Sequence, residues 1–375
     1  MNLLLLEPYN TGSHAQWAAG YQKHSRHQVD ILALAGANWK WRMHGGAVTL
    51  ARRFMESPHA PDAIVATDML DLSTFQALTR RRTAGTPMAV YFHENQMSYP
   101  WSPADRDVVH KRDKHYGFIN YASAMAADAV YFNSQYHLAS FFEELVRLLK
   151  HFPDHNELGT VDQIRDRSSV LRLGMDLRRF DDFAGGATGY EESEGPLVVW
   201  NHRWEYDKNP DEFFKALRGL AGDGIPFRLA VLGENFSQVP VVFFKAKDAL
   251  GDRIVQFGYA EGFDAYARWL QSADVIPVTS HQDFFGASVV EAVYCGCRPL
   301  LPDRLAYPEL IPENCREGIF YNGYEGLVDR LRGLLVDPEP PDERIRAAML
   351  RFDWETMAPQ YDRLFERLAN RDATV

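Results

Sequence analysis

The chain has 375 residues, of which 46% are hydrophobic and 24% are charged, and its formal net charge is −11. This length is sufficient for two domains, or for one large domain, with a buried core in each. Aromatic residues make up 13% of the chain, which excludes a protein disordered throughout. The net acidity excludes a nucleic-acid coat protein that is basic all over, although a local basic groove remains compatible with it.

Cysteine usage and hydropathy indicate the compartment. Cys295, Cys297 and Cys315 form no Cys-x-x-Cys pair, which is typical of free thiols in a reducing environment. The apolar start of the chain ends at Glu7 and Pro8, too early for a secretion signal. No run of about 18 uncharged apolar residues predicts a membrane span. We therefore expect a cytoplasmic protein that does not enter a membrane.

Short apolar runs alternate with helix-length stretches in the first half of the chain. The predicted strands are Leu3–Leu6, Val29–Leu34, Ala63–Ala66, Met88–Phe92, Ala129–Phe132 and Ser169–Leu173. The predicted helices are His14–His24, Gly46–Glu56, Leu72–Arg81, Tyr116–Ala126 and Gln135–Leu149. Apolar runs separated by helices are typical of a parallel sheet covered on both faces.

Residues 181–196 interrupt this alternation with glycines and acidic residues, a composition typical of a linker. The alternation then restarts. The predicted strands are Leu197–Trp200, Phe227–Leu232, Ile254–Phe257, Val275–Val278 and Arg298–Leu301. The predicted helices are Asp211–Leu220, Val239–Leu250, Phe263–Leu270, Ala287–Cys295 and Gly323–Leu335.

The predicted fold class is therefore α/β, with two doubly wound domains. Residues 1–180 form the N-terminal domain and residues 197–351 form the C-terminal domain. Residues 352–375 contain a further helix, which has an apolar stripe suited to packing back on the N-terminal domain. Ligands of such sheets bind outside the carboxyl ends of the strands, so a cleft between two facing domains is the favoured place for a site.

Several common nucleotide and metal motifs are absent. The sequence contains neither GxxxxGK[ST] nor GxGxxG, so a P-loop and an ordinary dinucleotide site lose support. His93 and Glu94 begin like the zinc motif HExxH, but the second histidine, which zinc would need, is missing. We therefore expect no metal and no cofactor.

A basic loop follows the first strand of the second half. Arg203 and Lys208 lie in this loop, directly before a predicted helix. Two cations at this place are able to grip a diphosphate, with the positive end of the helix as a third contribution. The alternative is a solvated loop in which Glu205 and Asp207 pair locally with these cations, and the two interpretations are equally supported by this segment alone.

An acidic motif follows the strand Val275–Val278. Asp283 lies in the loop, and Glu291 lies about two turns into the next helix. Gly286 allows a close approach of the backbone to a ligand, and the following amides are able to meet a phosphate. The alternative is a capped helix with a solvated Glu291, but the apolar neighbours of Glu291 disfavour it because a buried acid needs a partner.

This combination of motifs resembles the retaining glycosyltransferases of family four, which have the GT-B fold of two Rossmann-like domains facing a central cleft. The resemblance implies that Arg203 and Lys208 bind the donor diphosphate and that Glu291 binds the nucleotide ribose. It further implies that the sugar is held by Asp283, where the family usually has Glu. The remaining donor contacts implied by the resemblance are Phe284, Phe285, Gly286, Ala287 and Ser288.

A narrower resemblance covers nearly the whole chain. The segments that carry it are Glu7–His14, Trp39–Arg42, Tyr91–Pro100, His202–Lys208 and Glu291–Cys297. These segments are similar to those of the tRNA-queuosine α-mannosyltransferases, which transfer mannose from GDP-mannose to the cyclopentene-diol of queuosine in the anticodon of tRNA for aspartate. The resemblance implies the same donor and the same acceptor here.

The N-terminal segments contribute further candidates. Gly12 and Ser13 follow the first strand and open a helix, where they are able to lie against the donor, or else form a plain capped turn. His93 follows a strand among side chains suited to hydrogen bonds with a sugar, and the family resemblance puts it beside the donor sugar. Glu94 and Asn95 are candidate acceptor contacts, and the alternative is a polar network that braces the loop at Tyr99 and Pro100.

A tRNA acceptor requires cations and stacking faces on the protein. The candidates of this kind are Trp39, Lys40, Trp41, Arg42, Lys111, Arg112 and Lys114. Any one basic run is more often a solvated helix face than an RNA contact, so their shared location in the N-terminal half is the evidence that favours binding.

The implied reaction is glycosyl transfer with retention, in which His93, Asp283, Arg203 and Lys208 act at the reacting centre. Three alternatives stay open: a glycosyltransferase of the same fold with a small-molecule, lipid or polysaccharide acceptor, a sugar-nucleotide epimerase, and a non-catalytic module that binds a nucleotide sugar or tRNA. The predicted partners are queuosine-containing tRNA and a nucleotide sugar. The sequence makes no prediction of the oligomeric state.

Overall fold

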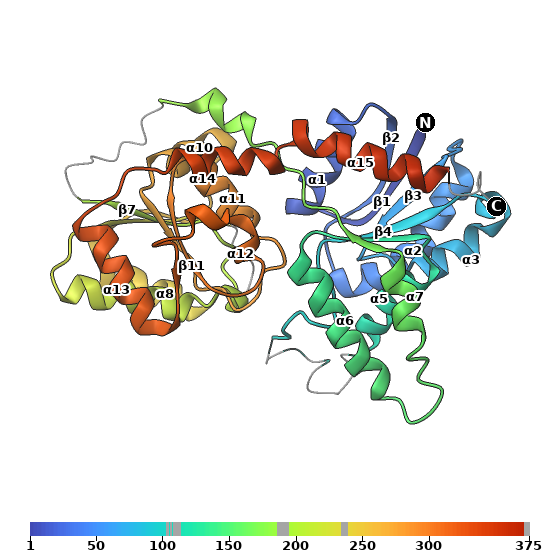
Figure 1. Cartoon of the computed structure of the whole chain (residues 1–375), viewed down its shortest axis with the longest axis horizontal. Coiled ribbons are helices and arrows are strands. Elements are labelled where there is room, and N and C mark those ends of the chain that lie inside the picture. The colour runs from blue at the N-terminus through green and yellow to red at the C-terminus, as the bar shows by residue number, and fades with distance from the viewer. Residues whose placement is uncertain (103–104, 106, 108–113, 186–194, 234–238, 371–375) are drawn as a thin grey trace. The chain divides into compact units, whose positions relative to one another are not determined.

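The computed structural model describes residues 1–102, 105, 107, 114–185, 195–233 and 239–370. The chain forms two compact units, drawn in Figure 1. The first unit contains Met1–Asp176 and the segment that begins at Phe352. The second unit contains Leu177–Arg351.

The first unit is built on a parallel six-stranded sheet of order β2-β1-β3-β4-β5-β6. Its strands are β1 (Asn2–Asn10), β2 (Gln28–Ala35), β3 (Ala63–Thr67), β4 (Met88–Phe92), β5 (Ala129–Phe132) and β6 (Ser168–Val170). Its helices are α1 (Gly12–His24), α2 (Trp39–Glu56), α3 (Leu72–Thr83), α5 (Lys114–Ala126), α6 (Gln135–Lys150), α7 (Thr160–Asp166) and α15 (Trp354–Ala369).

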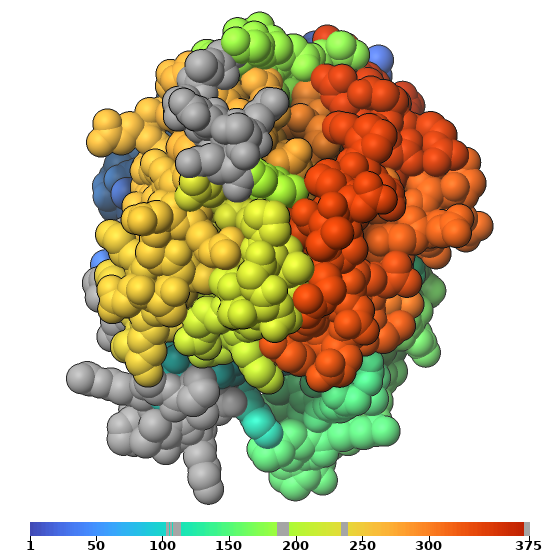
Figure 2. Space-filling view, turned by 90° about the vertical axis from the view of Figure 1, so that its left-hand side faces the viewer, coloured from blue at the N-terminus to red at the C-terminus, as the bar shows by residue number. Residues whose placement is uncertain are grey.

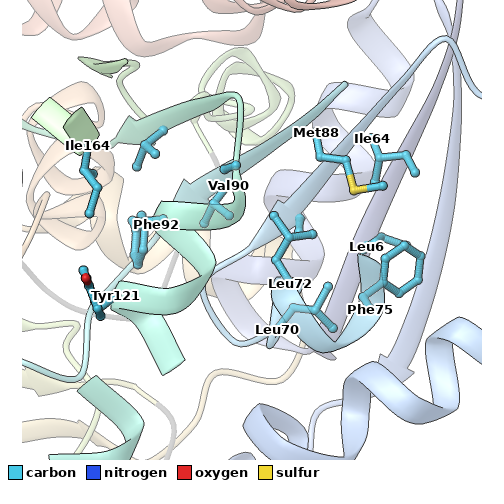
Figure 3. Packing of buried hydrophobic residues seen from close by; sticks show 14 of the residues in the cluster. Leu6, Ile64, Leu70, Leu72, Phe75, Met88, Val90, Phe92, Tyr121 and Ile164 are labelled. Carbon is cyan, nitrogen blue, oxygen red and sulfur yellow. The ribbon is translucent and has the colours of Figure 1, made fainter. Parts of the chain in front are cut away.

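Burial on both faces explains why the central strands read as unbroken apolar runs. Every residue of β3, β4 and β5 is buried. Leu6, Ile64 and Val90 belong to one buried hydrophobic cluster with Phe75 of α3, and Figure 3 shows these residues. A sheet covered on both faces removes apolar surface from contact with water along its whole length, and this burial stabilises the layered arrangement.

Helix α2 begins at Trp39 rather than at the predicted Gly46. The glycine pair in its middle suggests a helix start, but both glycines are buried inside the helix. A Cβ at Gly45 would lie 2.5 Å from the Trp41 ring, and one at Gly46 would lie 3.2 Å from Cβ of Pro8. These glycines therefore serve close packing rather than a turn.

The last helix, α15, belongs to the first unit and lies beside α1 (Figure 1). The indole N–H of Trp17 donates to the Tyr361 hydroxyl at 3.0 Å, and the Tyr21 hydroxyl donates to Asp362 at 2.9 Å. The amide of Trp354 donates to the Met175 carbonyl at 2.9 Å. Buried hydrogen bonds join the two helices because their aromatic side chains carry polar ends that need partners.

The second unit repeats the architecture, with a parallel sheet of order β12-β11-β10-β7-β8-β9. Its strands are β7 (Leu197–Trp200), β8 (Arg228–Val231), β9 (Ile254–Phe257), β10 (Val275–Pro277), β11 (Arg298–Pro302) and β12 (Phe320–Tyr321). Its α-helices are α8 (Pro210–Gly222), α9 (Val241–Leu250), α10 (Phe263–Ser272), α11 (Ala287–Tyr294), α12 (Tyr307–Leu310), α13 (Gly323–Val336) and α14 (Glu343–Met349). The short 3₁₀ helices are η1 (Arg178–Phe183), η3 (Tyr206–Lys208), η4 (Gly251–Arg253), η5 (Glu313–Cys315) and, at the unit boundary, η6 (Leu350–Phe352).

Three helices cover one face of this sheet. Figure 2 shows that face, with α8 in yellow-green between α9 and α13. Beneath them, Trp200, Trp204 and Phe243 form an aromatic core, in which the Trp204 and Phe243 rings stack at 4.3 Å. The chain moves from β7 to β8 on one side, whereas β10 pairs with β7 on the other side. Ligands of open α/β sheets usually bind at such a switch point, here at the carboxyl ends of β7 and β10.

Most predicted strands and helices occur within a few residues of their predicted bounds. The last predicted strand of the first half is shifted, because β6 ends at Val170. The short elements α7, α12, α14 and β12 were not predicted, since each is too short to show a period. Part of the predicted linker, residues 186–194, lies outside the described residues. Among the described helices, none is both long enough and apolar enough to cross a membrane.

Candidate active site

Lys208 is the centre of the polar cluster in the second unit. It lies in η3, between β7 and α8, and its ammonium is 2.8 Å from the Gln282 carbonyl oxygen. The same nitrogen lies 3.3 Å from Asp207 and 3.4 Å from Asp283. Burial alone would lower the pKa of Lys208, but Asp283 and Asp207 outweigh it and raise the pKa. Lys208 is therefore a buried ammonium whose charge is favoured by its two carboxylate neighbours.

Asp283 is held from three sides. Its carboxylate accepts hydrogen bonds from the Phe285 amide at 3.4 Å and from the Tyr307 hydroxyl at 3.2 Å, in addition to the contact with Lys208. Burial would raise the pKa of Asp283, but Lys208 and these donors lower it. The structure therefore brings two predicted site residues, Lys208 and Asp283, into one ion pair from loops that follow neighbouring strands.

Glu291 lies inside α11, and its partner is Tyr266 of α10. The Tyr266 hydroxyl donates to the Glu291 carboxylate at 2.6 Å, and Asn201 donates to the Tyr266 hydroxyl at 3.2 Å. Burial raises the pKa of Glu291 to about 7, and the Tyr266 hydrogen bond opposes this rise. One carboxylate oxygen is thus fixed by the protein, and neither Tyr266 nor Asn201 was predicted from the sequence.

The first turn of α11 is where the sequence predicts backbone contacts with the donor phosphate. Gly286 precedes this helix at a φ of 95°, a conformation that favours glycine, and a Cβ there would lie 3.0 Å from Leu310. No side chain caps the helix start at Ala287. The Ser288 hydroxyl is 2.8 Å from Nδ1 of His202, whose pKa is lowered to about 4 by burial and by Lys208. His202 is therefore neutral.

The other predicted donor contacts of the second unit differ in exposure. Phe284 and Phe285 are both buried. The side chain of Arg203 is 44% exposed, and its guanidinium lies 3.3 Å from Glu205. The local salt bridge considered as the alternative is thus present, but it leaves a large part of the Arg203 side chain open to solvent. A surface salt bridge contributes little to stability, so the Arg203 guanidinium is able to exchange Glu205 for a phosphate at little cost.

The first unit holds a second polar cluster, around His93 at the end of β4. The His93 amide donates to Asp68 at 2.7 Å, and Asn133 donates to the His93 carbonyl at 2.9 Å. The His93 ring lies 4.2 Å from the His14 ring. Burial, then the neighbouring His14, lowers the pKa of His93 well below its ordinary range. Burial raises the pKa of Asp68 above its ordinary range, and the neighbouring His14 opposes this rise.

The other N-terminal candidates have distinct environments. Gly12, at a φ of 50°, and the exposed Ser13 begin α1, at the end of β1. Glu94 accepts a hydrogen bond from Gln96 at 2.8 Å. Asn95 is fully buried, and its carboxamide oxygen accepts from the Ser98 amide at 2.9 Å, so it braces the loop.

The candidates for RNA contact are only partly available. Lys40 lies 2.6 Å from Asp105 and 2.5 Å from Asp107, above the ring of Trp39. Arg42 donates to the Ala35 carbonyl at 3.1 Å. Trp41 is 63% exposed and Lys114 is also exposed. The remaining candidates, Lys111 and Arg112, lie outside the described residues.

One group of side chains among the described residues has the spacing of metal ligands. Ligand atoms of Glu7, His14 and His93 lie within 4.8 Å of one another. However, Nδ1 of His14 is already 3.1 Å from the Glu7 carboxylate, and the two imidazole rings are tilted by only 38°. Metal-binding nitrogens point at one common centre. In this structure Glu7 and His14 form an ion pair, and the His14 ring lies against the His93 ring.

Comparison with solved structures establishes the fold, and a family model indicates the class of protein. Sucrose-phosphate synthase from Thermosynechococcus elongatus has a TM-score of 0.72 at 15% identity, over 98% of this chain and 99% of that chain. The Anabaena HepE protein, crystallised with UDP and glucose, has a TM-score of 0.67 at 14% identity, over 98% of this chain and 99% of that chain. Residues 190–351 match the family model described as glycosyl transferases group 1. The protein is a glycosyltransferase with the predicted α/β, GT-B fold.

The N-terminal half identifies the particular family. Residues 2–175 match the family model described as tRNA-queuosine alpha-mannosyltransferase N-terminal. A Drosophila melanogaster protein named tRNA-queuosine alpha-mannosyltransferase is 32% identical over 317 residues, covering 83% of this chain and 82% of that protein. The chain belongs to the tRNA-queuosine alpha-mannosyltransferase family, which confirms the resemblance seen in the sequence.

Proposed function

We propose that this protein transfers mannose from GDP-mannose to the cyclopentene-diol of queuosine in the anticodon of tRNA for aspartate, with retention at the anomeric carbon. The observation that carries the proposal is the similarity to the Drosophila tRNA-queuosine alpha-mannosyltransferase over 83% of the chain. The free thiols of all three cysteines fit a reducing cytoplasm as the place of the reaction.

The donor is held by the second unit. Lys208 and Arg203 contact the diphosphate, and the uncapped first turn of α11 points its amides at the same anion. The open carboxylate oxygen of Glu291 accepts hydrogen bonds from the ribose hydroxyls. These fixed positive groups stabilise the charge that develops on the leaving diphosphate, so the proposed reaction requires no metal.

The bond changes involve the donor and the acceptor alone. The bond between the anomeric carbon and the diphosphate oxygen breaks, and a bond from that carbon to an acceptor hydroxyl oxygen forms on the same face. The hydroxyl proton moves to the departing phosphate. Asp283 binds the sugar, and His93 donates or accepts a hydrogen bond at a sugar hydroxyl. The carboxylate of Asp283 is already bound to Lys208 at 3.4 Å and to Tyr307 at 3.2 Å, so its role combines sugar contact with the placing of Lys208.

The acceptor contacts are proposed on the first unit. The exposed Trp41 ring provides a stacking face for an unpaired base, and Arg42 and Lys114 provide charge. Lys40 contributes less, because Asp105 and Asp107 already balance its charge.

The test is mass spectrometry of nucleosides from tRNA incubated with the protein and GDP-mannose. Gain of one hexose on queuosine, absent with tRNA that lacks queuosine, supports the proposal. Faster transfer from UDP-glucose would overturn the donor assignment. Transfer to a lipid or a free sugar, with none to tRNA, would overturn the acceptor assignment.

Arg203→Ala supplies the test of the donor site. We expect it to reduce transfer by a factor on the order of 100, because it removes one fixed charge at the leaving group. Arg218→Ala is the matched control, since Arg218 is an exposed arginine of the neighbouring helix α8. Equal activity of both variants would remove Arg203 from the proposed role.

A further inference from the structure

Glu7 is a carboxylate in the middle of a buried strand, and its side chain is 0% exposed. Both of its oxygens are engaged. One accepts from the Tyr9 amide at 2.8 Å, and the other lies 3.1 Å from Nδ1 of His14. A buried carboxylate destabilises a fold unless such partners are present. Burial would lower the pKa of His14, but Glu7 outweighs it and raises the pKa to about 9. At neutral pH the two side chains therefore form an ion pair.

The cationic ring of this pair lies against His93. The two imidazole rings are 4.2 Å apart with a tilt of 38°. Trp17 and Tyr91 contact the His93 ring edge-on, each at 4.8 Å. These rings pack against the His93 side chain on several sides. Its Nε2 is inaccessible to solvent and has no hydrogen-bond partner among the described residues.

We propose that Glu7 and His14 are positioning residues: their ion pair orients the His93 ring and keeps it uncharged where His93 meets the transferred sugar. This inference rests on the proposed function, because the sugar contact of His93 belongs to it. A neutral ring suits the reaction, because glycosyl transfer develops positive charge at the anomeric carbon and a second cation beside it would be unfavourable.

The charge state of His93 depends on every titratable group around it. Those groups are Glu7 of β1, His14 of α1, Asp68 after β3, Glu94 after β4 and His137 of α6. Of these, His14 is the cation in direct ring contact with His93. Its removal is therefore the sharpest perturbation of the His93 charge.

The variant that tests the pair is His14→Asn, which retains a donor near the position of Nδ1 but removes the ring and the charge. We expect kcat to fall about tenfold at pH 7 with the KM for GDP-mannose changed less than about twofold. We also expect a new acidic limb in the kcat profile, since protonation of His93 becomes easier without the neighbouring cation. His24→Asn is the matched control, because His24 lies on the same helix and stacks on Trp354 instead.

Glu7→Gln keeps the shape of the side chain and removes its charge, and it provides a second variant. Its kcat loss should match that of His14→Asn, and the double variant should be no worse than either single one, because the pair acts as a unit. A uniform loss of kcat with no change in the pH profile would show a merely structural role. Stoichiometric zinc in the purified protein, lost in Glu7→Gln, would show a metal site. Either result overturns the inference.

Histidine ¹⁵N NMR without substrate separates this inference from the proposed function. The His93 pKa should be higher in His14→Asn than in the unaltered protein, and His24→Asn should leave it unchanged. If this rise occurs in a protein that does not mannosylate tRNA, the proposed function fails and the charge control of His93 stands. If mannose is transferred and the His93 pKa does not move, the inference fails and the proposed function stands.

Discussion

The hydrogen bond from Tyr266 to Glu291 leads to a quantitative prediction for Tyr266→Phe. The oxygen–oxygen distance is 2.6 Å, and the acceptor is a carboxylate whose pKa is raised to about 7 by burial. A hydrogen bond to a charged group contributes about 1.5 kcal/mol, which corresponds to about one pKa unit. Because the bond favours the ionised carboxylate, its loss raises the Glu291 pKa further, by about one unit.

This shift determines how donor binding changes with pH. If the ribose is bound by the ionised carboxylate, the ionised fraction falls from about three quarters to about one quarter at pH 7.5. The Kd for GDP-mannose then rises about threefold at pH 7.5 and about eightfold at pH 6.5. GDP-mannose binds both the unaltered protein and Tyr266→Phe more weakly as the pH falls. In the variant this loss of affinity begins at a higher pH.

Isothermal titration calorimetry with GDP-mannose between about pH 6 and 8.5 measures this shift. Tyr324→Phe is the matched control, since Tyr324 is a half-buried tyrosine on α13, outside the donor cluster. If the Kd of Tyr266→Phe rose by the same factor at every pH, the hydrogen bond would not control the ionisation of Glu291. The reasoning from burial to ribose binding would then be wrong.

Further predictions concern stability and RNA binding. The pKa of Glu291 is raised from 4.5 to about 7 in the folded protein, so the folded state holds a proton on Glu291 that the unfolded state has released, and stability is lost as the pH rises from 4.5 through 7. Glu291→Gln should therefore raise the melting temperature at pH 8 but not at pH 4. An equal rise at both pH values would contradict this linkage between protonation and stability. Lys208→Ala leaves two buried carboxylates without their cation, so the free energy of unfolding in urea should fall by about 3–5 kcal/mol; a loss under about 1 kcal/mol would mean that water replaces the ammonium. Trp41→Ala should weaken binding of queuosine-containing tRNA about tenfold in fluorescence titrations, in keeping with the stacking energy of one base. Lys40→Ala should leave the salt dependence of tRNA binding unchanged. A flatter salt dependence would show that Lys40 does contact a phosphate.

The sequence alone predicted the architecture because parallel sheets buried on both faces have a strong local signal. The apolar runs at Met88–Phe92, Ala129–Phe132 and Leu197–Trp200 coincide with strands β4, β5 and β7. Strand ends then indicate where polar residues gather, and this placed Lys208 and Asp283 at one edge of the second sheet. Short elements such as β12 escaped prediction, since two residues are too few to show a hydrophobic period.

Partners from distant parts of the chain were decided by the tertiary structure. The apolar neighbours of Glu291 in the sequence already indicate that its carboxylate needs a partner. Only the packing of α10 beside α11 shows that this partner is Tyr266. Lys40 looked available in the sequence and is bound to two carboxylates in the fold. Hydrophobic periodicity is encoded in neighbouring residues, whereas a hydrogen bond or ion pair depends on two segments whose separation in space no local pattern records.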